Sequence, residues 1–146
     1  PPGRRNVDDN DVLMGKKIFF SLGCNSCHVQ KYNTDNQLKN SILSNQLIWP
    51  YSDFLLHDMG EELADNLSEF MASGNEWRTP PLWGIGLAEN VNGDTNLLHD
   101  GRAKTILEAI LWHGGEAEIS QKLFKIPSKN IQHQTLKLLK FLKQFI

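Results

Sequence analysis

One five-residue string in this chain, Cys24-Asn25-Ser26-Cys27-His28, combines residue types and a spacing that can do chemistry. Two thiols at this separation lie one helical turn apart, so both can reach the vinyl groups on one edge of a porphyrin. A histidine directly after them can offer its imidazole to the iron. The string therefore predicts one covalent haem c, attached through Cys24 and Cys27, with His28 as the proximal iron ligand.

A Cys-x-x-Cys pair also occurs in redox disulfides and in zinc sites. A zinc site needs a second Cys or His pair at ligand spacing, whereas this chain has 2 cysteines in all and its other histidines are scattered singly. A thioredoxin-like motif follows a β-strand, whereas the residues before Cys24 have the apolar spacing of a helix. We therefore favour haem attachment over these two alternatives.

Size and charge narrow the class of protein. A chain of 146 residues with 40% hydrophobic residues fits one domain with a buried core. A formal net charge of −2 provides no basic footprint for nucleic acid, and no stretch approaches the roughly 20 apolar residues that span a membrane. Because covalent haem requires export, we expect a periplasmic or otherwise exported bacterial protein. Residues 1–10 are expected to be a linker or cut N-terminus, and residues 11–146 the haem domain.

The residues before the motif predict the helix that positions it. Asn10 or Asp11 is expected to cap this helix, which runs to about Leu22. Gly15 and Phe19 lie on one of its faces, where the small residue lets another helix approach and the aromatic ring fills the gap beside it. In small c-type cytochromes this face crosses the C-terminal helix.

After the motif the sequence predicts loops and short helices. Residues 29–50 are polar and expected to be loop, and residues 61–75 a mobile surface excursion. Thr105 and Glu108 form a capping box for a short helix, a second short helix follows, and a last one covers about 129–145. The apolar stripe expected on that last helix is Ile131, Leu138, Leu139, Leu142 and Phe145. The expected fold is all-α, a cytochrome-c-like domain with a long irregular loop after the haem-attachment motif.

Several further motifs, in this order and spacing, resemble the di-haem oxidoreductases related to bacterial cytochrome c peroxidase, in particular the thiol oxidoreductase or peroxidase branch. These motifs are Gly15-x-x-x-Phe19, the string from Cys24 to His28, Tyr51 to Gly60, Glu76 to Gly84, Leu98 to Arg102 and Leu107 to Ala117. The resemblance implies two cytochrome-c-like domains in the whole protein, of which this chain is similar to the C-terminal one. Its six-coordinate haem would pass electrons to an N-terminal haem where peroxide reacts. A second Cys-x-x-Cys-His string is absent from the sequence, so the peroxidase chemistry itself is not carried over.

Two side chains are candidates for the sixth position on the iron. The resemblance aligns His113 with the residue that supplies the distal ligand in the peroxidase relatives, and the glycine pair after it is expected to leave room for the porphyrin edge. Met59 is the alternative, because thioether ligation is common in cytochromes c. Their ordinary roles, a histidine at a helix end and a methionine in the core, stay open. His57 and His99 are expected to be hydrogen-bonding residues rather than ligands.

Other residues are candidates for contact with the haem periphery. Arg78 is the first candidate partner of a propionate, because a guanidinium offers a bidentate fork, and Arg102 is the second. A surface salt bridge is the alternative for both. Trp83 is expected, with Trp77 and Trp112, to form apolar walls of the haem pocket.

These expectations combine into an electron-transfer domain in which His28 and His113 are the iron ligands and the partner is a redox protein or an N-terminal haem domain. One alternative is a self-sufficient haem peroxidase or oxidase with a labile distal ligand, which would need an acid–base group near His113. The glutamates near His113 in sequence are Glu108, Glu116 and Glu118. The other alternative is a haem-based redox sensor in which His113 and Met59 exchange.

Overall fold

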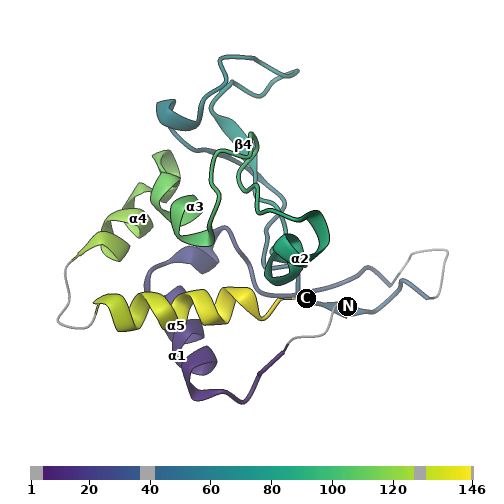
Figure 1. Cartoon of the computed structure of the whole chain (residues 1–146). Coiled ribbons are helices and arrows are strands. Elements are labelled where there is room, and N and C mark those ends of the chain that lie inside the picture. The colour runs from purple at the N-terminus through teal and green to yellow at the C-terminus, as the bar shows by residue number, and fades with distance from the viewer. Residues whose placement is uncertain (1–4, 37–41, 127–130, 146) are drawn as a thin grey trace.

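The computed structural model describes residues 5–36, 42–126 and 131–145 of the chain. Within these residues the α-helices are α1 (Asn10–Ser21), α2 (Ala88–Asn92), α3 (Ile106–Trp112), α4 (Glu118–Lys125) and α5 (Ile131–Lys143). Four single helical turns connect them: η1 (Cys24–Ser26), η2 (Glu61–Leu63), η3 (Ile85–Leu87) and η4 (Gly115–Ala117). Helices α1 and α5 cross at one end of the molecule, and the shorter helices lie on the same side of that crossing (Figure 1).

The start and end of α1 follow from local chemistry. The carboxylate of Asp9 accepts hydrogen bonds from the amides of Asp11, at 2.7 Å, and Val12, at 3.3 Å. Asp9 is therefore the cap, and the expectation of Asn10 or Asp11 in that place is wrong. After the last turn, Gly23 has φ +80°, a conformation that glycine adopts without steric cost. This residue turns the chain into the attachment string.

The crossing of α1 and α5 is built on Gly15, as the sequence predicts. A β-carbon on Gly15 would lie 2.0 Å from the carbonyl oxygen of Lys137 on α5 and 2.8 Å from Cβ of Phe141. Phe19 fills the space beside it, with its ring centroid 5.4 Å from that of Phe141. The buried core around this contact is Val12, Phe19, Tyr51, Ile106, Leu138, Phe141, Leu142 and Phe145. Residues 129 and 130 of the predicted last helix and the side chain of Ile131 lie outside the described residues.

The expectation of an all-α fold is confirmed only in part: the described residues are mainly helical, but they also contain two small antiparallel sheets. Strand β1 (Tyr32–Asn33) pairs with β2 (Leu47–Ile48) inside the segment expected to be loop. Strand β3 (Leu56–Asp58) pairs with β4 (Glu76–Arg78) in the register Leu56 to Arg78. Strands of two or three residues are too short to leave an alternating pattern, and they form because backbone groups at the base of a loop need partners.

The β3–β4 ladder closes the excursion of residues 59–75, which projects from the body at the end opposite the α1–α5 crossing (Figure 1). The excursion has its own hydrogen bonds. The amide of Asp65 donates to the Gly74 carbonyl at 3.2 Å, and the indole N–H of Trp77 donates to the Leu63 carbonyl at 3.0 Å. Residues 61–75 are thus a surface excursion as expected, and one with defined internal bonding.

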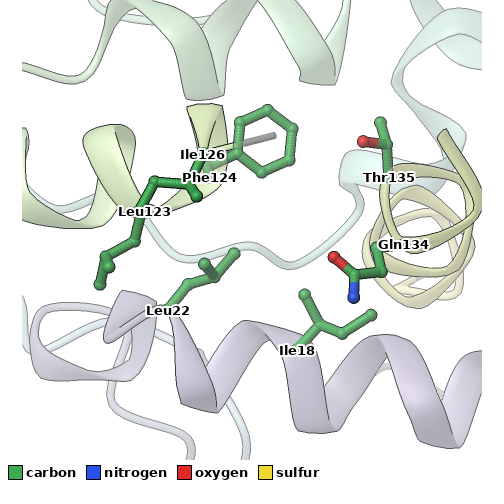
Figure 2. A pocket seen from close by; sticks show the side chains of 7 residues that line it. All are labelled: Ile18, Leu22, Leu123, Phe124, Ile126, Gln134 and Thr135. Carbon is green, nitrogen blue, oxygen red and sulfur yellow. The ribbon is translucent and has the colours of Figure 1, made fainter. Parts of the chain in front are cut away.

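A small cavity lies between α1, α4 and α5 (Figure 2). It is lined by Ile18, Leu22, Leu123, Phe124, Ile126, Gln134 and Thr135. The apolar members come from α1 and the α4 segment, and the two polar members come from α5. The cavity borders Leu22, directly before the attachment loop, and contains none of the candidate ligands. No helix among the described residues is long and apolar enough to cross a bilayer.

Candidate haem site

The two cysteines lie on a single helical turn and are both free thiols. The amide of His28 donates to the Cys24 carbonyl at 3.0 Å, which closes the turn and brings the histidine next to the thiols. Burial raises the pKa of the Cys24 thiol to about 11. Burial also raises the pKa of the Cys27 thiol, with a further contribution from nearby carboxylates. A redox disulfide motif works through a thiolate of lowered pKa, so these thiols do not have the character of that alternative.

His28 is held by the main chain of the segment that follows β2. Its Nδ1 lies 2.9 Å from the carbonyl oxygen of Tyr51, and the Tyr51 ring is fully buried in the core. Burial lowers the pKa of His28 to about 4, although the bond to Tyr51 acts in the opposite direction. The imidazole is therefore neutral at pH 7, with its proton assigned to Nδ1 by this bond. That leaves the Nε2 lone pair free, which is the state in which histidine binds a metal.

His113 has the same arrangement as His28, an imidazole bonded through Nδ1 to a main-chain carbonyl. It follows the last residue of α3, and its Nδ1 lies 2.6 Å from the carbonyl oxygen of Ala109 one turn earlier. Burial lowers its pKa, so this imidazole is neutral as well. The two rings are close enough for a charge on His113 to lower the pKa of His28. The structure thus brings the two predicted ligands into one neighbourhood, and neither Nε2 has a partner among the described residues.

Met59 lies against the turn that follows His113. A β-carbon on Gly114 would be 2.9 Å from the Met59 carbonyl oxygen, and one on Gly115 would be 2.2 Å from the Asp58 carbonyl oxygen. The glycine pair therefore makes room for the backbone at the end of β3, whereas the expected neighbour was a porphyrin edge. Met59 and His113 are both half-buried, and the backbone of Met59 approaches Gly114, the residue after His113.

His57 connects the two sides of this site through a network that the sequence did not reveal. Its Nε2 lies 2.8 Å from a carboxylate oxygen of Asp53, and its Nδ1 lies 2.8 Å from one of Glu116. The bond to Glu116, followed by the bond to Asp53, raises the pKa of His57 above its ordinary value, although partial burial opposes this. His57 is thus the hydrogen-bonding residue that was expected. Its partner Glu116 is 59 positions away, so no local pattern could have indicated the pair.

A metal ion has one further candidate site in the described part of the chain. Ligand atoms of Cys27, Asp53 and His57 lie within 4.8 Å of one another. Both ring nitrogens of His57 are already engaged by carboxylates, and a metal would have to displace one of them. Attachment of Cys27 to a haem would also remove its thiolate as a ligand. This cluster therefore fits the zinc alternative less well than the two histidines fit a haem.

The two arginines differ in what they already bind. Arg78 is exposed on β4 opposite Leu56, and its guanidinium makes no hydrogen bond or ion pair with the described residues. Arg102 donates from Nε to Asp100 at 2.6 Å and stacks over the ring of Trp112, with 4.9 Å between the guanidinium carbon and the ring centroid. Arg78 is therefore available to bind an anionic group, whereas the guanidinium of Arg102 is already bound to protein groups.

The tryptophans are engaged mainly with neighbouring protein groups. Trp83 is 39% exposed, and its indole N–H donates to the Trp49 carbonyl at 2.6 Å. Trp77 stacks on His99 with 3.5 Å between ring centroids and 8° between ring planes. The predicted role of Trp83 as a wall of the haem pocket stays a prediction, since a half-exposed ring is compatible with a pocket edge and with the open surface.

Comparison with known protein families gives one match. A family model described as "Di-haem oxidoreductase, putative peroxidase" matches residues 1–144, which include the attachment string and His113. No curated protein and no solved structure shows a significant match to the chain.

Proposed function

The chain belongs to the di-haem oxidoreductases, and on this premise we propose that it is a haem c electron-transfer domain, the six-coordinate module of a two-haem protein. Cys24 and Cys27 would hold one haem covalently, with His28 and His113 as the iron ligands. One observation carries the proposal: each of these imidazoles is neutral, bonded through Nδ1 to a main-chain carbonyl, and free at Nε2.

The residues present fit such a group. Two unpaired thiols at attachment spacing and two imidazole nitrogens with free lone pairs form the donor set of a bis-histidine haem c. When bound, the haem would carry one electron at a time between ferric and ferrous iron. The protein's own part is to orient the ligands. The carbonyls of Tyr51 and Ala109 fix the tautomer of each ring and increase its basicity, and burial keeps both rings unprotonated.

The glutamates near His113 favour electron transfer over peroxide turnover by this chain alone. A peroxidase site needs an acid–base group at the open face of the iron. Glu116 is bonded to His57, Glu108 accepts from the amide of Lys104 at 2.6 Å, and Glu118 pairs with Lys122 at 2.9 Å. Each carboxylate is committed elsewhere. The second haem of the family, with any peroxide chemistry, would then belong to a redox partner or to an N-terminal haem domain.

Two further points belong to the proposal. Because covalent haem requires export, the protein would work in the periplasm or another exported compartment. Met59 touches the turn after His113 through its backbone, and this contact supports a redox sensor with exchange of these two ligands as the second candidate function.

Optical and EPR spectra of the ferric holoprotein test the proposal. We expect a low-spin spectrum that hydrogen peroxide leaves unchanged, and haem that stays with the protein through acid–acetone extraction unless Cys24 and Cys27 are replaced by Ser. His113→Ala should give high-spin haem that binds cyanide rapidly, whereas the matched variant Met59→Leu should stay low-spin. A low-spin His113→Ala variant together with a high-spin Met59→Leu variant would identify Met59 as the distal ligand. A high-spin wild type that turns over peroxide would make this chain an enzyme.

A further inference from the structure

The network centred on His57 joins two parts of the chain that are far apart in sequence. Asp53 belongs to the segment that packs on the attachment string, and Glu116 belongs to η4, three residues after His113. His57 lies between them at the middle of β3 and uses both ring nitrogens, each at 2.8 Å from a carboxylate oxygen. One imidazole therefore bridges the elements that carry the two candidate ligands.

The proximal end of the bridge is fixed to the attachment string. The amide of Asp53 donates to the Cys27 carbonyl at 2.8 Å, one residue before His28. One oxygen of its carboxylate accepts from the amide of Leu55 at 3.0 Å, and the other contacts Nε2 of His57. The side chain of Asp53 is 9% exposed and that of His57 is 15% exposed. This end of the bridge is thus shielded from water, unlike an ordinary surface ion pair.

The distal end is fixed through both oxygens of Glu116. One oxygen contacts Nδ1 of His57, and the other accepts from the amide of Asp58 at 3.0 Å. The backbones meet at the same place, where a β-carbon on Gly115 would be 2.2 Å from the Asp58 carbonyl oxygen. Glu116 therefore holds the turn after His113 against the end of β3 by two hydrogen bonds and a close backbone contact.

We propose that Asp53, His57 and Glu116 are positioning residues that form a clamp between the loop carrying His28 and the turn carrying His113. The clamp fixes the separation of the two imidazoles, and so decides how firmly His113 stays on the iron. This inference rests on the proposed function, because it takes these two histidines as the ligands. It gives His57 and Glu116 a role distinct from binding the haem itself.

The test is the rate at which cyanide binds the ferric holoprotein, since cyanide enters only when the distal ligand leaves. Glu116→Ala and His57→Phe each remove two hydrogen bonds of the clamp, and the net loss of even one charge-assisted hydrogen bond corresponds to about a tenfold change in an equilibrium. We expect Glu116→Ala to bind cyanide about ten times faster than wild type. We expect the same of His57→Phe, in which phenylalanine keeps a ring of similar size. The matched control is Glu118→Ala, which removes a nearby glutamate whose partner is the exposed Lys122. It should leave the rate unchanged.

Hydrogen exchange provides a second measurement that does not depend on the iron. The amide of Asp58 donates to Glu116, so its exchange should become faster in Glu116→Ala and stay unchanged in Glu118→Ala. If Glu116→Ala does not yield holoprotein, the cyanide rate and the exchange of the Asp58 amide are both measured in His57→Phe instead.

The outcomes separate the two proposals. Cyanide rates in Glu116→Ala and His57→Phe equal to that of Glu118→Ala would overturn the clamp. A wild type that binds cyanide at once would contradict the assignment of His113 as ligand. In that case, hydrogen exchange of the Asp58 amide would be the remaining test of the clamp. Unchanged exchange in Glu116→Ala would overturn the clamp in that case also.

Discussion

Replacement of Gly15 by Ala tests how the fold positions the attachment string. Gly15 lies two turns before the end of α1, where the helix backbone meets α5, and the cysteines follow directly after α1. A β-carbon at this position would lie 2.0 Å from the Lys137 carbonyl oxygen, whereas ordinary contact begins at 3.4 Å. The two helices would have to separate by roughly 1.4 Å at their crossing. That displacement would act on the core and on the loop that carries His28.

The size of the effect follows from two opposing contributions. Overpacking of a core costs about 1–3 kcal/mol, and the upper value applies here because the obstacle is backbone, which no change of rotamer removes. Alanine has a better helix propensity than glycine by about 1 kcal/mol. The net expectation is a loss of about 2 kcal/mol in the free energy of unfolding. For a protein of this size that corresponds to a fall in Tm of roughly 4–8 °C.

Urea unfolding of the holoprotein, followed by far-UV circular dichroism, measures this loss. Lys17→Ala is the matched control, because it introduces the same side chain two residues along the same helix at an exposed position. It should change the free energy of unfolding by less than about 0.5 kcal/mol. A Gly15→Ala variant as stable as wild type, or stabilised by the propensity gain, would refute the close crossing of α1 and α5.

Three further substitutions test other parts of the structure. Gly86→Ala would place a β-carbon 2.0 Å from the Lys143 carbonyl oxygen, so we expect a fall in Tm similar to that of Gly15→Ala, and an unchanged Tm would contradict the contact. Trp77→Phe removes the indole bond to the Leu63 carbonyl, at a cost of about 1 kcal/mol, and limited proteolysis should cut the excursion faster than in wild type. The pKa of His57 is raised in the folded state, so its stabilising effect is complete below the unfolded pKa near 6.5 and is lost as pH rises through the folded pKa. The difference in unfolding free energy between wild type and His57→Phe should therefore be larger at pH 6 than at pH 9, and equal differences would contradict the charged bridge.

The helix crossing was predictable from sequence in part. A glycine and an aromatic residue four positions apart marked the contact face of α1, because that spacing repeats each helical turn. On α5 the apolar stripe predicted Leu138, Leu142 and Phe145 correctly but omitted Phe141, which is fully buried. Lys137 lies outside that apolar stripe, yet its side chain is only 18% exposed. Phe141 lies three positions after Leu138, so helical periodicity places it on the same face, and the prediction overlooked it. The partial burial of the Lys137 side chain, in contrast, accompanies the close backbone contact at Gly15, which periodicity does not show.

The short strands and the clamp were not predictable for a different reason. Each depends on groups that meet only in the folded chain. The β3–β4 ladder consists of three residue pairs, too few to leave an alternating pattern. The bond between His57 and Glu116 spans 59 positions. A histidine does not predict which of the distant glutamates it will bind. The attachment string, by contrast, was recognisable because the residue types and spacing that predict haem attachment all lie within five consecutive residues.

The glycine pair after His113 illustrates how two separate motifs form one unit. In sequence, Gly114 and Gly115 indicate a close neighbour, which we expected to be the porphyrin edge. In the structure the close neighbour is the main chain from Asp58 to Gly60, the end of the other motif, and the Glu116 carboxylate crosses the same gap to the Asp58 amide. Any β-carbon at position 115 would push these backbones apart. The spacing of the candidate ligands is thus determined by a backbone contact that only glycine permits, and by the hydrogen bonds that hold it closed.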